Sequence, residues 1–273
     1  MENPTVLKKN IDILLIKCCI NNFSDLFKNT FIKFIMPYLY NRHYNDCIHR
    51  YLIICYIKGS IRIIQIIYDL IPKLKNIDEQ TKIHLLYRIF SGGNTDSFKF
   101  FFNLCHDKNI DITVDDIKSL NNNIIYNTVR KNHLDLFKVF FNKFPEIFND
   151  DSLVKEIVKE IFNICCHRKY KSFIDYLITI NLHTKLTNED KEECFKKAFF
   201  NKSIHIIRTL LENINYTNEI ETLFDFVISN TNNILYSKSI IKILANYISI
   251  NNHPRKDDIF YRVITKFPDF LIE

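Results

Sequence analysis

Pairs of adjacent apolar residues recur along this chain, each followed three residues later by a second apolar pair. The clearest copy is the stretch 132–141, NHLDLFKVFF, where Leu136-Phe137 and Phe140-Phe141 are the two pairs and Lys138 stands between them. Residues at this spacing lie on one face of an α-helix. A polar residue in the middle of the pattern is typical of the face of the same helix that meets water. The pattern therefore predicts an amphipathic helix at each copy.

Seven copies can be aligned, and a candidate turn residue lies four positions before each first apolar pair. These residues follow one another at intervals of 33 to 39 residues and are Asn22, Gly59, Gly93, Asn132, Lys169, Lys202 and Tyr236. Glycine and asparagine tolerate the positive φ that a tight turn between helices often needs. A second apolar face, with Leu15, Leu52 and Leu86, precedes the turns. Each copy is thus predicted to be a helix, a short turn and a second helix.

One helix–turn–helix unit cannot bury its apolar side alone, so neighbouring units are expected to stack. We predict an all-α fold in which residues 1–273 form a single elongated repeat domain of about seven units. The sequence shows no linker rich in proline, glycine or serine that would divide it. The last stretch, 254–273, is expected to be a C-terminal cap.

The repeated pattern resembles the ankyrin repeat. The segments that carry the resemblance are 128–138, TVRKNHLDLFK, and Gly59 to Ile64, GSIRII. The Thr-Pro-Leu-His opening and the Gly-Ala-Asp exit of that family are missing, which implies that its β-hairpin fingers are reduced or absent. The bias toward Ile, Asn, Lys, Phe and Tyr is similar to that of divergent ankyrin-repeat proteins encoded by large AT-rich DNA viruses.

The resemblance implies a non-catalytic scaffold or adaptor that binds another protein. In ankyrin proteins the residues just before the turn often face the concave binding surface. The matching candidates here are Lys58, Arg130, Lys131, His167, Arg168 and Asn201. Several are basic, which favours a partner with an acidic surface. A competing interpretation is that Lys and Arg at a helix C-terminus stabilise the helix dipole, by about 0.3 to 1 kcal/mol.

Charge supports an alternative function, binding of nucleic acid or another anionic surface. The net charge is +6, and residues 1–75 hold 11 Lys and Arg against 5 Asp and Glu. Nucleic-acid sites combine clustered basic residues with aromatic rings that stack on bases. The stretch that resembles such a site consists of Arg42, His43, Tyr44, His49, Arg50 and Tyr51. Ordinary solubilising lysines explain the same excess.

The eight cysteines are interpreted as packing residues. Cys18, Cys55 and Cys165 occupy the same position, four before the turn, and free cysteine behaves as a small buried hydrophobe. His43, Cys47 and His49, or Cys165, Cys166 and His167, could be read as zinc ligands, but neither set has a CxxC pair or a matching second half. We expect neither a metal nor a cofactor.

No catalytic constellation stands out. Asp115-Asp116 and Glu192-Glu193 are adjacent, and adjacent helical residues do not face each other, so solvated surface is the expected role of both pairs. Gly92-Gly93 lacks the context of a phosphate-binding loop and is predicted to form a turn between helices.

The apolar run Ile11 to Ile20 contains Asp12 and Lys17 and is shorter than the roughly 20 residues that span a bilayer. We therefore expect no membrane insertion. Because no catalytic constellation is present, we also expect no enzyme activity. The same reading predicts a monomeric cytoplasmic protein, located in the host cytoplasm if it is viral.

Overall fold

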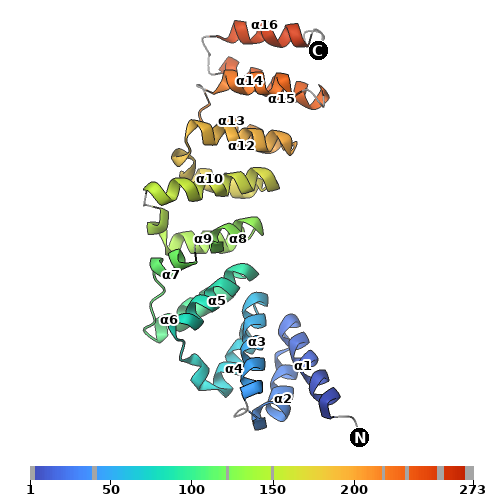
Figure 1. The fold of residues 1–273 in the computed structure, drawn as a ribbon, viewed down its shortest axis with the longest axis vertical. Helices are drawn as coiled ribbons and strands as arrows, with labels where there is room; N and C mark the ends of the chain where they lie inside the picture. The colour runs from blue at the N-terminus through green and yellow to red at the C-terminus, as the bar shows by residue number, and fades with distance from the viewer. Residues whose placement is uncertain are drawn as a thin grey trace. The chain divides into compact units, whose positions relative to one another are not determined.

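A computed structural model of the chain describes residues 4–38, 42–120, 123–148, 151–216, 219–230, 234–250 and 255–267. Within these ranges the fold is all-α, as predicted, and contains no β-strand (Figure 1). None of the described helices combines the length and the apolar character needed to cross a membrane. The chain divides into two compact units, residues 1–147 and residues 148–273, which are described separately.

Unit 1 consists of helix pairs in which each first helix packs against the first helix of the next pair. Its described helices are α1 (Pro4–Asn21), α2 (Ser24–Phe34), α3 (Arg42–Lys58), α4 (Ile61–Leu70), α5 (Glu79–Gly92), α6 (Thr95–Asp107), α7 (Val114–Ser119), α8 (Asn123–Arg130) and α9 (Leu134–Lys143). Helices α1, α3, α5 and α8 make one row, and α2, α4, α6 and α9 make the other.

Unit 2 repeats this arrangement. Its described helices are α10 (Asp151–Arg168), α11 (Lys171–Thr179), α12 (Asn188–Phe200), α13 (Ile204–Asn213), α14 (Ile220–Ser229), α15 (Ile234–Ile250) and α16 (Lys256–Lys266). Helix α10 packs against α12 and helix α11 against α13, whereas α16 packs against both α14 and α15. Helix α16 lies within the stretch where the sequence predicts a cap, and residues 251–254 and 268–273 lie outside the described ranges.

The turns inside the pairs have a common backbone geometry. Six of the seven candidate turn residues, Asn22, Gly59, Gly93, Asn132, Lys169 and Lys202, have positive φ. In most of them the N–H that follows the turn residue donates back across the turn to the carbonyl five residues earlier, as from Ser60 to Cys55 at 3.0 Å. This is the six-to-one hydrogen bond of a Schellman motif, which ends a helix and leaves the chain free to reverse.

The seventh candidate turn is a correction. Tyr236 lies inside α15, which begins at Ile234, whereas α14 ends at Ser229. The apolar pair Ile240-Ile241 does mark the buried face of α15, because both residues are fully buried. Helix α15 begins earlier, relative to this pair, than the second helices of the other copies, so counting back four residues ends inside the helix.

The predicted apolar face forms the core of both units. Leu136 and Phe137, the pair that defines the pattern, are fully buried, as are their counterparts in α4 and α13. Leu26 is the exception and is 46% exposed. Helix α4 packs against both α2 and α6, whereas α2 packs on this row only against α4, so one flank of Leu26 is uncovered.

The connections between pairs are also helical. Short 3-10 turns occupy Met36–Tyr38, Pro72–Lys75, Pro145–Phe148 and Leu182–Lys185. After the turn that contains Pro37, α3 begins at Arg42. Helix α7 lies in the connection before α8 and begins with a capping box, in which Thr113 and Asp116 each accept the other's backbone N–H.

Candidate functional site

The residues nominated from the sequence lie at the C-terminal ends of first-row helices, in both units. Lys58, Arg130 and Lys131 belong to unit 1, and His167, Arg168 and Asn201 belong to unit 2. All are exposed except Asn201, which is half-buried. Because the first-row helices of each unit pack side by side, their C-termini share one edge, called here the turn edge of that unit.

In unit 1, successive turns are in direct contact. The Ser60 hydroxyl donates to the Cys19 carbonyl at 2.5 Å, and the Asn94 amide group lies against Gly59. The ring of His133 lies against Gly93. Each turn thus rests on the one before it, which fixes the spacing between the helix ends.

Lys131 has a structural partner at this edge. Its ammonium donates to the carbonyl of Ser91, near the C-terminus of α5, at 2.6 Å. A lysine that satisfies a helix-terminal carbonyl stabilises the fold. Stabilisation of a helix end therefore accounts for Lys131, whereas Lys58 forms no hydrogen bond or ion pair with a described residue.

In unit 2 the structure brings two nominated residues together. The Asn201 amide nitrogen lies 3.3 Å from Nδ1 of His167, across the contact between α10 and α12. Beside them, Arg168, Lys169 and Lys202 are exposed, and none forms an ion pair with a described residue. We call His167, Arg168, Lys169, Asn201 and Lys202 the basic turn edge.

Two lysines of the basic turn edge are in the left-handed conformation. Lys169 has φ +64° and Lys202 has φ +53°, whereas unit 1 has only Asn or Gly at its turns. A residue with a long side chain pays about 1 to 2 kcal/mol for this conformation, and glycine avoids the cost. The repeat pattern identifies these lysines as turn residues, but they are not among the residues before the turn that were predicted to bind. The signal was present, since Lys replaces Gly or Asn at both positions.

Next to this edge lies a cluster of aromatic side chains. Phe199 of α12 contacts Phe226 of α14 and Tyr236 of α15, both at ring-centroid distances of 5.2 Å. Phe200 packs edge-on against Phe226 at 5.4 Å, yet it is 63% exposed. The sequence contained the Phe199-Phe200 run, but helical periodicity alone does not show which ring is left uncovered.

Two carboxylates occupy buried positions that sequence analysis did not expect. Lys82 on α5 and Asp116 on α7 are both buried, and the ammonium lies 2.9 Å from Oδ2 of Asp116. The expectation that Asp116 is solvated is therefore wrong, whereas its neighbour Asp115 is exposed. Unit 2 repeats the arrangement with Asp190 of α12, which accepts from Thr187 in a capping box and pairs with Lys159 at 2.9 Å.

These contacts change the ionisation of the buried groups. Burial opposes the charge on Asp116, but hydrogen bonds from the Thr113 N–H and from Lys82 outweigh it, so the pKa of Asp116 lies below its ordinary value. Burial likewise opposes the charge on Lys82, whose pKa is nevertheless raised by Glu79 and Asp116. Both groups are therefore charged at neutral pH, and the arrangement is an ion pair rather than an acid–base couple.

Two residues of the basic stretch of the N-terminal third are engaged by one carboxylate. Arg50 pairs with Asp12 at 2.6 Å, and the Tyr51 hydroxyl donates to the same carboxylate at 2.7 Å. The Tyr51 ring is fully buried. The side chains of Arg42, His43 and Tyr44 lie outside the described residues.

Seven of the eight cysteines are buried, as expected for packing residues. The exception is Cys47, and all eight are free thiols. Burial raises the pKa of Cys105 to about 11 and also raises that of Cys165. Within the described part of the chain, no group of three or more His, Cys, Asp or Glu side chains is placed to hold a metal ion.

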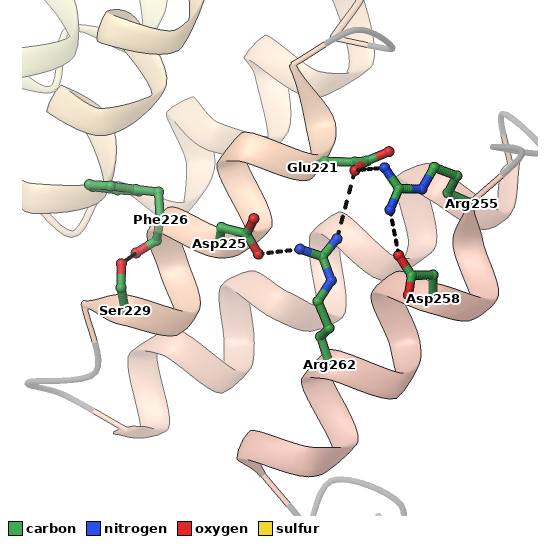
Figure 2. A network of polar contacts seen from close by, with 7 residues as sticks. All are labelled: Glu221, Asp225, Phe226, Ser229, Arg255, Asp258 and Arg262. Atoms are coloured by element: carbon green, nitrogen blue, oxygen red, sulfur yellow. Dashed lines mark hydrogen bonds and ion pairs between the residues drawn. The ribbon is translucent and has the colours of Figure 1, made fainter.

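A last cluster of charges joins α14 to α16 (Figure 2). Arg262 of α16 pairs with Asp225 at 2.6 Å and lies 3.8 Å from Glu221, while Arg255 bridges Glu221 and Asp258 at 2.8 and 2.7 Å. These charges are engaged with one another and tie α16 to the unit. The network is therefore a structural junction, in contrast to the basic turn edge.

Comparison of the chain with protein-family models, with curated proteins and with solved structures finds no match.

Proposed function

We propose that this chain is a non-catalytic, ankyrin-like scaffold that binds an acidic surface of another protein, and that the basic turn edge of unit 2 is the contact. The observation that carries the proposal is the set of exposed cations Arg168, Lys169 and Lys202, which no described carboxylate neutralises. Such cations attract a negatively charged partner and speed its association.

Stabilisation of helix ends does not account for all three. Arg168 is the last residue of α10, where a positive charge interacts favourably with the helix dipole. Lys169 and Lys202 stand at positive φ, where Gly or Asn would fit the backbone better. Strained residues that persist at a surface are candidates for a functional role. The resemblance of the turn pattern to ankyrin repeats supports the same conclusion.

The alternative, nucleic-acid binding through the N-terminal third, has less support. Arg50 and Tyr51 are both engaged by Asp12, which leaves neither the charge nor the ring available to a base.

The test is affinity capture from cytosol with the full chain, with and without nuclease, repeated with a variant that combines Arg168→Glu, Lys169→Glu and Lys202→Glu. A matched control combines Lys155→Glu, Arg208→Glu and Lys242→Glu, which reverses three charges on helix faces of the same unit. The proposal is supported if one protein is captured in a stoichiometric amount, is still captured after nuclease treatment, and is no longer captured by the first variant while the control variant still captures it. Capture that disappears with nuclease, or that is lost only in the control variant, contradicts it.

A further inference from the structure

An exposed apolar group stands beside the basic turn edge, because Phe200 precedes Asn201 in the chain and Leu235 precedes Tyr236, whose ring contacts Phe199. It consists of Phe200 at the end of α12 and of Ile234 and Leu235 at the start of α15, which are 63%, 56% and 79% exposed. Single exposed apolar residues are common, but a contiguous group beside charged residues is typical of an interaction site. We call these three residues the apolar patch.

Phe200 packs on an aromatic cluster. Phe200 is seated on Phe226, and Phe199 bridges Phe226 and Tyr236, so three helices contribute to one aromatic cluster. The Phe226 ring lies on the side of α14 away from Arg262 (Figure 2). The ammonium of Lys196 lies 5.3 Å from the centroid of the same ring. Preorganised aromatic groups of this kind lose little entropy on binding and often anchor an interface.

The patch and the cations are linked through Phe200 and Asn201. Phe200 directly precedes Asn201 and Lys202, and Asn201 contacts His167 beside Arg168. A ligand that touched Lys202 with a carboxylate would therefore reach Phe200 with its next residues.

We propose that the basic turn edge and the apolar patch together bind one peptide segment of the partner, in which acidic residues are followed or preceded by an apolar anchor. This inference rests on the proposed function and specifies the chemistry of the partner. Charge complementarity selects the acidic part, and burial of the patch selects the anchor. A second copy of the chain fits poorly, because bringing two such edges together would place Arg168, Lys169 and Lys202 opposite like charges.

The probes are fluorescein-labelled peptides, whose binding to the full chain is measured by fluorescence anisotropy at low salt. One carries a run of glutamates joined to Leu-Trp-Leu, with the anchor placed at either end in separate peptides. A second replaces the anchor by serines, and a third keeps the anchor and replaces the glutamates by glutamines. We expect the better of the anchored acidic peptides to bind about tenfold more tightly than either of the other two.

The variant Phe200→Ser with Leu235→Ser tests the patch. It is expected to lower the affinity for the anchored peptide to that for the serine peptide, and to leave the serine peptide unaffected. Tyr261→Ser, which removes a side chain of α16 that is 71% exposed, is the matched control and is expected to change neither. If Phe200→Ser lowers the melting temperature, Leu235→Ser alone carries the test, because that side chain is the most exposed of the three.

The outcomes separate the two proposals. Equal affinity for the anchored and the serine peptide overturns the apolar patch but leaves the basic turn edge intact, provided that reversal of Arg168, Lys169 and Lys202 weakens both. Binding of the serine peptide that is insensitive to that reversal overturns the proposed function itself. Absence of binding by every peptide overturns both.

Discussion

Lys82 and Asp116, which are 34 positions apart in the sequence, form a buried ion pair between α5 and α7 with 2.9 Å between ammonium and carboxylate. The pair satisfies two charges that would otherwise be costly to bury. Lys82 also donates to the Asp111 carbonyl at 2.9 Å, so the lysine holds both the start of the connection before α8 and the helix within it.

We expect Asp116→Ala to lower the free energy of unfolding of the chain by about 3 kcal/mol, because it leaves the Lys82 ammonium buried with only the exposed Glu79 as a carboxylate partner. The same change removes the acceptor for the Thr113 N–H at the start of α7. Urea unfolding measures the effect. Asp115→Ala, one residue away and exposed, is the control and should change stability by no more than about 0.5 kcal/mol. Equal effects of the two substitutions would contradict the ion pair.

A second prediction concerns the pH dependence of the turn at Gly93. Burial, and next the charge of Lys131, lower the pKa of His133 below its ordinary value of about 6.5. The native state therefore binds this proton less readily than the unfolded chain. The contribution of the neutral ring is complete above about pH 6.5 and is lost as the pH falls through that value toward the lowered pKa.

His133→Asn should remove this loss of stability at low pH, because asparagine does not titrate. Asn94 already occupies the equivalent position in the preceding helix pair. The measurement is the urea midpoint of both proteins between about pH 5 and pH 8. Parallel pH curves for the two proteins would rule out His133 as the titrating group.

Helices α3 and α5 approach each other closely at Gly92, so a substitution there should lower stability. A Cβ atom on Gly92 would lie 2.6 Å from both Cα and the carbonyl oxygen of Ile57, on the backbone of α3. Because backbone cannot move aside as a side chain can, Gly92→Ala should separate α3 from α5 and cost about 1 to 3 kcal/mol. Thermal unfolding measures it, and Ser91→Ala, the preceding residue of the same helix, should be close to neutral. A stable Gly92→Ala protein would show that the helices are not held this close.

Substitution of the lysines of the basic turn edge should stabilise the fold but weaken binding. Lys169→Asn and Lys202→Asn should each raise the free energy of unfolding by about 0.5 kcal/mol, because asparagine tolerates positive φ better than lysine. Both should weaken binding of the acidic peptides. Lys155→Asn, on an ordinary turn of α10, should instead lower stability slightly through its weaker helix propensity. Destabilisation by the turn substitutions would remove the argument from strain.

Much of the helical architecture could be read from the sequence, because periodicity and turn chemistry are local. The pair Leu136-Phe137 and the glycine at 93 identify a buried face and a left-handed turn without any knowledge of neighbours. Asp116 shows where this fails. Its burial depends on Lys82 in another element, and a pattern of adjacent carboxylates carries no trace of that contact.

The candidate site was predicted less well, for a similar reason. Position before the turn selects Arg168, Asn201 and Lys131 alike, although the Lys131 ammonium donates to a helix-terminal carbonyl, that of Ser91. Phe200 was missed because exposure depends on how α12, α14 and α15 meet. Local rules place a side chain at the edge, and only packing decides whether it is free.

The buried cysteines give the molecule a set of internal reporters. A thiol reacts with an alkylating reagent only as an accessible thiolate. Five of the cysteines are buried and have a raised pKa, namely Cys18, Cys55, Cys105, Cys165 and Cys194. Their alkylation in the native protein must wait for the surrounding helices to open. Because these residues are distributed over both units, the labelling rate of each one would time the opening of its own helix pair, without any engineered probe.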